Sequence, residues 1–121
     1  MIRNLTPHPV RVYAPDTADR IDDLDAGLRT VIPPEETPAR INVRSMGPSP
    51  SPAHDGVLIP TVLTEYGHIT GLPNPEPRVY LVVSLVVALA ARGRSDLLVP
   101  DAEVRNTDGT VVGCRRLASP C

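Results

Sequence analysis

The chain has 121 residues, with 12 basic and 14 acidic side chains, a formal net charge of −2, 15 prolines and neither tryptophan nor phenylalanine. The slight negative charge argues against non-specific nucleic-acid binding, which needs a dense basic face, and the shortage of aromatic rings removes the usual stacking platform for single strands. The length predicts one domain over residues 1–121, with a modest core of Val, Leu, Ile and Ala.

The cysteines and the longest apolar run indicate the compartment. Cys114 and Cys121 are too few for a secreted disulfide scaffold, although one bridge between them would close a short terminal loop. No apolar leader follows Met1. The apolar run from Val79 to Ala91 is too short to cross a bilayer and is typical of buried core. We therefore expect a cytoplasmic protein with no membrane contact and no cofactor.

The first third of the chain predicts short strands. Residues Ile2–Tyr13 alternate apolar and polar side chains in their second half, while two prolines make the first half an edge or a bend. The acidic stretch Pro15–Gly27 is expected to be a solvated loop or hairpin tip. Thr30–Ile32 predicts a short strand that ends at two prolines, and Ala39–Val43 predicts another strand.

The middle of the chain is the least structured part of this prediction. Ser45–Ala53 is rich in Pro and Ser, so we expect a mobile or extended loop over about residues 45–55. Val57–Tyr66 predicts a bent strand or a strand pair, with Pro60 at a bulge or an edge. His68–Pro77 is expected to be a constrained loop.

The segment Val79–Pro100 determines the predicted fold. Val79–Val83 favours a strand because its residues are β-branched or aromatic, and Ser84–Arg92 favours a short helix ended by Gly93. Asp96–Pro100 adds a second strand, which gives a β–α–β unit. A single helix over residues 78–92 is the alternative, since the run is apolar on every face and its periodicity does not decide.

The end of the chain predicts a β-hairpin. Glu103–Arg105 and Thr110–Leu117 flank Asp108 and Gly109, a pair that favours a tight turn. Together these elements predict an α+β or small α/β fold. It would have a mixed sheet, one short central helix, a C-terminal hairpin and long Pro-rich loops.

The junction before the predicted helix is the first candidate site. A helix N-terminus directs free N–H groups at a bound anion, and nearby Arg side chains would add charge. The alternative is that Ser84 only caps its helix. His8, held between two prolines, could point at a ligand or pin its strand to a neighbouring loop. The predicted ligand-binding residues are His8, Ser84, Arg92, Arg94, Arg105 and Arg115.

Metal and nucleophile chemistry receive less support from the sequence. The candidate metal ligands lack the close spacing of a zinc motif, so we predict no metal site. Cys114 precedes Arg115 and Arg116, which would lower a thiol pKa, but a lone cysteine in a strand is usually a small core residue. We assign no catalytic residue. The candidate metal ligands are His8, His54, Asp55, His68 and Cys114.

Two blocks carry a resemblance to a known group of proteins. They are NLTPHPV (Asn4–Val10) and YLVVSLVVALAARGRSDLLVP with VRNTDGTVVGCRRL (within Tyr80–Leu117). The chain resembles, in these blocks, a family of small proteins from actinobacterial and phage genomes. The resemblance implies a cytoplasmic accessory protein of phage or prophage type, and it implies no catalytic residue.

Three functional hypotheses follow. The favoured one is a non-enzymatic protein that acts by binding a partner protein. The second is a binder of an anionic, nucleotide-like small molecule, with Ser84 and neighbouring Arg residues forming the site. The third is a small enzyme that uses His8 or Cys114. A homo-oligomer is compatible with all three, because a small core with edge strands gains stability by pairing.

Overall fold

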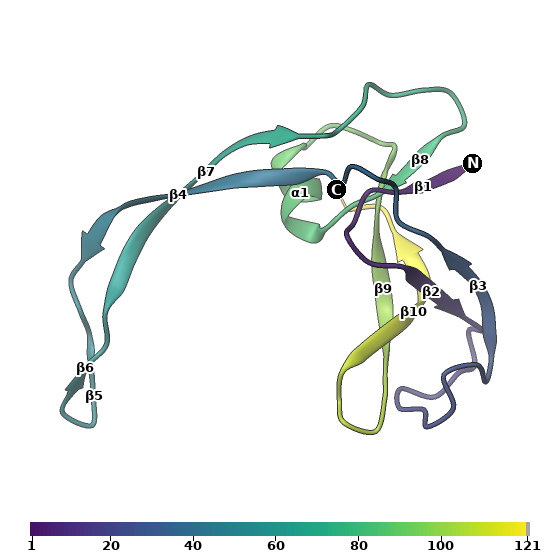
Figure 1. The fold of residues 1–121 in the computed structure, drawn as a ribbon, viewed down its shortest axis with the longest axis horizontal. Coiled ribbons are helices and arrows are strands. Elements are labelled where there is room, and N and C mark those ends of the chain that lie inside the picture. The colour runs from purple at the N-terminus through teal and green to yellow at the C-terminus, as the bar shows by residue number, and fades with distance from the viewer. Residues whose placement is uncertain (121) are drawn as a thin grey trace.

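A computed structural model describes residues 1–120 and shows a mostly β protein with one short helix (Figure 1). Strand residues make up 48% of the chain and helical residues 5%. The elements in chain order are β1 (Ile2–Asn4), β2 (Val10–Tyr13), β3 (Leu28–Ile32), β4 (Arg40–Ser49), β5 (Ala53–His54), β6 (Val57–Leu58), β7 (Thr61–Thr70), β8 (Tyr80–Val82), α1 (Leu85–Ala90), β9 (Leu97–Arg105) and β10 (Val111–Ala118).

Six strands form a nearly closed, barrel-like sheet in the order β1-β8-β9-β10-β2-β3. The pairs β1–β8, β8–β9 and β10–β2 are parallel, and β9–β10 and β2–β3 are antiparallel. The two outer strands, β1 and β3, approach each other at one end. There, Asn4 forms an isolated bridge with Pro34, and the Glu35 N–H donates to the Asn4 carbonyl at 2.8 Å. This bridge brings the two edges of the sheet together.

The Asn4 side chain fastens the closure. It is only 1% exposed, and its amide nitrogen donates to the carbonyls of His8 and Ile32 at 2.8 and 2.9 Å. Its amide oxygen accepts from the Thr6 N–H at 2.9 Å and from the Thr6 hydroxyl at 2.6 Å. One buried side chain therefore satisfies polar groups from the bend after β1 and from the end of β3.

The core lies on both faces of the sheet because β8 is buried on both sides. Val82 faces one side and packs with Val10 and Cys114. Leu81 and Val83 face the other side, as alternate residues of a strand must, and pack beneath α1. A strand buried on both faces reads as a continuous apolar run, which is why the sequence of this segment lacks alternation.

The helix α1 lies outside the sheet and connects two parallel strands. Ser84 caps it, with the Val87 N–H donating to the Ser84 hydroxyl at 3.3 Å, and Val87 and Ala88 are buried against the sheet. The β–α–β unit is therefore confirmed, and the alternative single helix over 78–92 is wrong. Gly93 has a φ of 92°, in the left-handed conformation expected after the helix.

The α+β or small α/β fold class is wrong. In residues 1–120 no helix reaches seven residues, and α1 covers the outside of the sheet instead of occupying its centre. The difference lies in the middle of the chain, where the Pro- and Ser-rich residues 45–49 form part of β4 instead of the expected loop. That segment adds two long strands, so the strand content rises well beyond what the sequence pattern indicated.

Residues 40–70 form a long two-stranded ribbon, here called the arm, which curves away from the barrel (Figure 1). Strand β4 pairs with β7, and the short pair β5–β6 continues the ribbon to its tip. At the tip, Asp55 and Gly56 have φ values of 49° and 79°, the pattern of a two-residue type I′ hairpin turn. The expected loop over 45–55 is thus the outgoing half of the arm.

The root of the arm is fixed to the barrel. The Ala39 N–H donates to the Leu5 carbonyl at 2.8 Å, immediately beyond Asn4. Gly71, where the chain leaves the arm, has a φ of 79°, and a Cβ there would lie 2.6 Å from the Pro38 carbonyl oxygen. Only glycine permits the segments that enter and leave the arm to approach each other this closely at the root.

The C-terminal hairpin is confirmed, with β9 and β10 paired antiparallel around residues 106–110. Its turn differs in detail from a two-residue turn. Gly109 has a φ of 86°, and the Asn106 side chain accepts from the N–H groups of Asp108 and Thr110. The Asx interaction therefore shapes the turn together with glycine.

We predict that Asn4→Ala lowers the free energy of unfolding by about 2–3 kcal/mol, because buried partners of the amide lose their hydrogen bonds. Urea denaturation followed by circular dichroism measures this change. Asn74→Ala, in an exposed loop, is the matched control and should change stability little. Equal effects of the two substitutions would show that Asn4 does not hold the closure.

Candidate functional site

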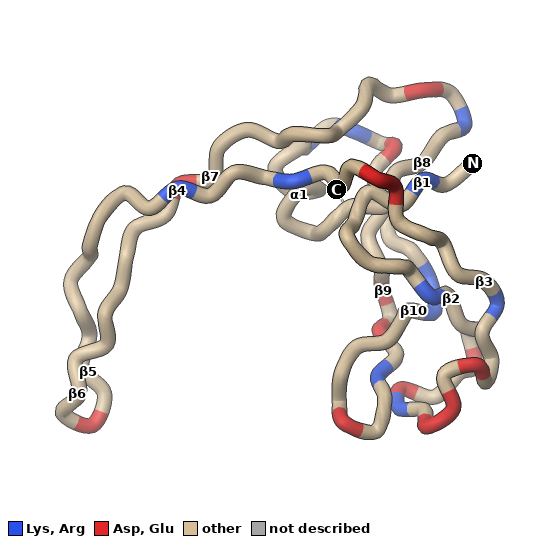
Figure 2. Tube along the Cα trace, viewed as in Figure 1, with Lys and Arg blue, Asp and Glu red and all other residues tan. Residues whose placement is uncertain are grey.

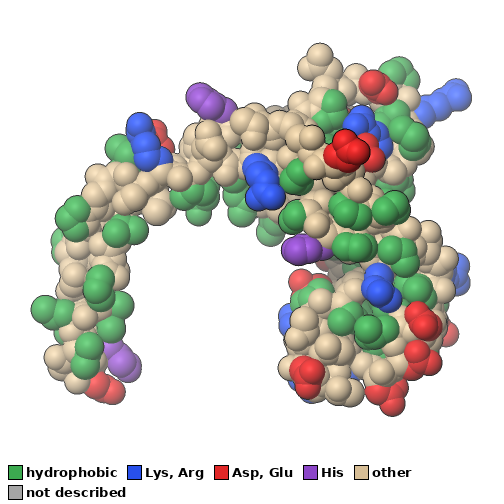
Figure 3. Space-filling model, viewed as in Figure 1, with side chains coloured by type: hydrophobic (Ala, Val, Ile, Leu, Met, Phe, Trp, Pro, Cys, Tyr) green, Lys and Arg blue, Asp and Glu red, His purple; other side chains and the backbone are tan. Residues whose placement is uncertain are grey.

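The arm carries a large set of exposed apolar side chains, here called the arm surface (Figure 3). Leu58 near the tip is 68% exposed, and Tyr66 is 60% exposed. Soluble chains rarely leave so many neighbouring apolar residues uncovered unless they bind something. The arm surface consists of Val43, Met46, Val57, Leu58, Ile59, Val62, Leu63 and Tyr66.

The arm surface begins directly beyond the part of the arm that packs on the core. Ile41 pairs with Ile69 at the root, and both pack against the buried cluster beneath α1. Beyond this pair the register shifts at an irregularity of the ladder, after which Val43 pairs with Tyr66. The first exposed pair of the arm surface therefore lies directly beyond the last pair that packs on the core.

The arm has few charges (Figure 2). Arg44 and Glu65 form an ion pair across the ribbon, and His54 lies 3.5 Å from Asp55 at the tip. Between Ser45 and Thr64 the only acidic or basic residue besides His54 is Asp55. By contrast, acidic side chains gather in the loop between β2 and β3 (Figure 2). The outer part of the arm is therefore close to neutral and predominantly apolar.

The outward side of α1 adds to this apolar area. Leu85, Val86 and Leu89 are each about half exposed, whereas Val87 and Ala88 point into the core. The helix contacts β4 at the root of the arm, on the inner side of the hook that arm and barrel outline (Figure 1). We call these three residues the α1 face.

Two of the six predicted ligand residues meet in one cavity, here called the His8 pocket. The pocket has a volume of about 260 Å³ and is bounded by the bend after β1, the start of α1 and strand β10. His8 and Ser84 both line it, as do Thr6, Arg11 and Cys114. The backbone carbonyl of His8, and not its imidazole, makes the contacts that pin the bend.

The four predicted Arg ligands do not converge on this pocket. Arg94 forms a two-bond pair with Asp96, at 2.9 and 2.6 Å, and the hydrogen bond from Arg94 lowers the pKa of the Asp96 carboxyl. Arg105 binds Glu103 and the Gly109 carbonyl. Arg115 binds the Thr17 carbonyl and Asp19. Arg92 lies exposed in the turn after α1.

The candidate metal ligands are widely separated. His54 and Asp55 are at the tip of the arm, His68 is in β7, and His8 borders the barrel. In residues 1–120 no three His, Cys, Asp or Glu side chains are grouped to hold a metal ion. Cys114 is fully buried beside the His8 pocket.

The surroundings of the Cys114 thiol indicate a structural role for this residue. Its S–H donates to the Arg11 carbonyl at 3.6 Å, and burial raises the pKa of the thiol. The thiolate is the nucleophilic form, so both effects oppose catalysis by this residue. The neighbouring Arg115 does not reverse this, because its guanidinium is bound to the Thr17 carbonyl and Asp19. The disulfide considered between Cys114 and Cys121 lies outside the described residues.

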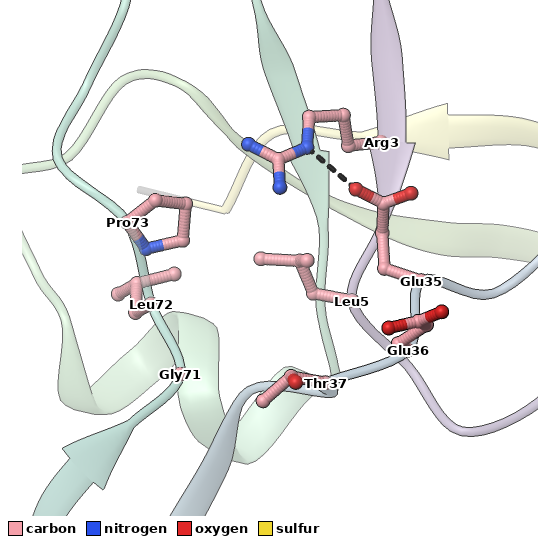
Figure 4. A pocket seen from close by; sticks show the side chains of 8 residues that line it. All are labelled: Arg3, Leu5, Glu35, Glu36, Thr37, Gly71, Leu72 and Pro73. Atoms are coloured by element: carbon pink, nitrogen blue, oxygen red, sulfur yellow. Dashed lines mark hydrogen bonds and ion pairs between the residues drawn. The ribbon is translucent and has the colours of Figure 1, made fainter.

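A wide hollow of about 590 Å³ lies beside the root of the arm (Figure 4). Arg3 and Glu35 on its wall form an ion pair at 2.8 Å, and buried Leu5 lies between them and the residues that leave the arm. Glu36 adds a second carboxylate. The single Arg is therefore already neutralised, which makes the hollow a poor anion site.

Sequence reasoning missed the arm surface, although one signal was present. His54-Asp55-Gly56-Val57 contains the same Asp-Gly pair that correctly marked the C-terminal hairpin. The prolines on either side of this pair favour loop over strand, so the sequence pattern predicted a loop instead of a hairpin. In the structure, Pro48 pairs with Val62, and the ribbon has no third strand to which either edge must donate.

In residues 1–120 the single helix has six residues and is too short to span a membrane.

We predict that Cys114 resists alkylation in the native state. In a Cys121→Ser background, labelling at neutral pH should be at least about 100-fold slower than in guanidinium chloride, because the thiol is buried and its pKa is raised. Mass spectrometry over time measures both rates. Comparable rates would show that the His8 pocket opens as far as the sulfur.

We also predict an acid dependence of stability from the Arg94–Asp96 pair. Because the folded pKa of Asp96 lies below its unfolded value, the pair stabilises the fold above about pH 4 and loses this contribution as pH falls through the folded pKa. Urea unfolding at several acidic pH values should show a shallower decline for Asp96→Asn than for the parent chain. Asp108→Asn, in an exposed turn, should leave the slope unchanged.

The chain matches no family model, no curated protein and no solved structure in the three comparisons. The grounds for a function are therefore its own surfaces: the arm surface, the α1 face and the His8 pocket.

Proposed function

We propose that this chain is a non-enzymatic binding protein that acts by laying its arm against a partner protein. The observation that carries the proposal is the arm surface, eight large apolar side chains on a ribbon that projects from the barrel. A two-stranded ribbon on its own is marginally stable in water. Packing against a partner protein removes this apolar surface from water and adds the second layer that the ribbon lacks.

The charge distribution favours a protein partner over a nucleic acid. Nucleic-acid binding needs several basic groups along one surface, and the outer arm from Ser45 to Thr64 has no Arg. Arg44 is already paired with Glu65. The cytoplasmic accessory role of phage or prophage type that the resemblance implies is compatible with this activity, which requires no catalytic residue.

A second candidate function is supported by the His8 pocket. Thr6, His8 and Ser84 line one apolar cavity, in which the Thr6 hydroxyl already donates to Asn4. The Ser84 hydroxyl, which accepts from Val87 as the helix cap, keeps its proton and would donate it to a small anionic ligand. The volume of about 260 Å³ falls just below the ~300–1,000 Å³ of typical small-molecule pockets, so the cavity would hold a small anion or part of a nucleotide. In this function the Arg ligands proposed from the sequence would have no part, since three of them hold other groups.

Thermal denaturation tests the second candidate. If the pocket binds a nucleotide, a panel of mono- and dinucleotides should contain one that raises the melting temperature of the parent chain and not of His8→Ala. His68→Ala, an exposed position on the arm, is the control that should keep the response. Equal shifts in the parent chain and in His8→Ala would exclude the pocket.

Site-specific photo-crosslinking tests the main proposal. A benzophenone side chain at Val62, on the arm, should form adducts with protein when intact cells are irradiated, whereas the same group at Val31, on β3, should not. Val31 is also exposed, at 42% against 59% for Val62, so a side chain there is accessible to solvent as well. Adducts that disappear with nuclease, or a complete lack of protein adducts at Val62, would overturn the proposal.

A further inference from the structure

We propose that the partner seated on the arm is a second copy of this chain, and that two copies exchange arms so that each arm packs on the α1 face of the other. This inference rests on the proposed function and names the protein that the arm binds. It is carried by two apolar areas on one chain, the arm surface and the α1 face, which no other part of residues 1–120 covers.

The two areas meet the requirement of a two-fold interface. Such an interface uses the same patch on both copies, so the patch must contain a surface and its complement. The arm supplies a projecting ribbon, and the α1 face supplies a shallow apolar area beside the arm's root. When two chains face each other across a two-fold axis, each arm reaches the other copy's helix, and both contacts form together.

The available surface is large enough for a stable dimer. Consecutive strand residues such as Val62 and Leu63 point to opposite faces of the ribbon, so one partner covers about half of the arm surface. With the α1 face this amounts to roughly 700 Å² per chain, and a standard interface buries about 600–1,000 Å² per partner. The aromatic anchor that such interfaces favour is present, because Tyr66 stands 60% exposed on the arm. The C-terminal hairpin lacks a comparable set, with Val111 as its one exposed large apolar residue.

Charge identifies the second copy in preference to a charged partner. The outer arm has one acidic residue and no Arg, and the α1 helix has no charged residue. Two such surfaces approach without repulsion, and no buried charge is left unpaired. A strongly basic or acidic partner would leave its own charges against this apolar strip, which is costly.

Sedimentation velocity of the purified full chain tests the inference. The parent chain should sediment as a dimer, and Val62→Glu on the arm and Leu89→Glu on the α1 face should each weaken dimerisation at least about 10-fold. Val31→Glu on β3 is the matched control and should remain dimeric. Circular dichroism and thermal melting should show that all three variants keep the fold.

A mixing experiment distinguishes arm exchange from other dimers. Val62→Glu retains an intact α1 face and Leu89→Glu retains an intact arm, so a mixture of the two should recover one of the two contacts and form heterodimers. If Leu89→Glu alone stays dimeric while Val62→Glu does not, the arms pair with each other and the exchange is overturned. A mass above two copies overturns the two-fold arrangement.

Different results overturn the proposed function and the exchange of arms. A monomeric parent chain at all concentrations overturns the exchange of arms. If benzophenone at Val62 then still captures a different protein, the binding function stands with another partner. If it captures none, both fail. Adducts of twice the chain mass, formed by the purified protein alone, support both.

Discussion

The fold depends on Asn4, whose buried side-chain amide holds together the two outer strands of the nearly closed sheet. β1 is only three residues long and would be a weak edge on its own. The Asn4 side chain binds the end of β3 and the bend that leads to β2, while its backbone carbonyl holds Glu35. Because every polar atom of the side chain has a partner, the amide is buried without an unsatisfied group, and the sheet gains a closed edge.

The same short segment anchors the arm. The Leu5 carbonyl, one residue after Asn4, accepts from Ala39 at the start of the ribbon. Leu5 and Ala39 lie in the cluster that also holds α1. The barrel closure, the helix and the root of the arm are therefore packed as one unit, and the ribbon leaves this unit in a fixed direction. Such a base allows a thin projection to present side chains to another molecule.

The sequence predicted the local elements well where one physical signal dominated. Ser84 was identified as a helix cap and Asp108-Gly109 as a turn, and both occupy those positions. It did not predict the arm, because Pro48 and its neighbours lower strand propensity in a central strand, yet are tolerated in a ribbon with two free edges. Sequence pattern alone does not reveal how many neighbours a strand has.

The candidate site shows the same limit. The sequence named His8 and Ser84 as separate candidates, and the structure places both on one pocket. The scattered Arg residues could not be assigned, since the carboxylates that bind Arg94 and Arg105 lie two residues away in sequence and compete with any ligand. An arginine's availability depends on its neighbours in space, and a sequence without homologues gives little information about them.

At the root of the arm, Gly71 lies against the Pro38 carbonyl, where the chain enters and leaves the ribbon. Beyond the Ile41–Ile69 pair, which still packs on the core, the arm is a two-stranded ladder that ends in a two-residue turn. From Gly47 to Ser49 the ladder is regular, so residues gained or lost in matched pairs on both strands of that stretch would change the length of the arm and keep the other side chains on their faces. Such changes would leave the packing of the barrel unaltered. The length of the arm can therefore change in evolution without changes in the barrel that carries it.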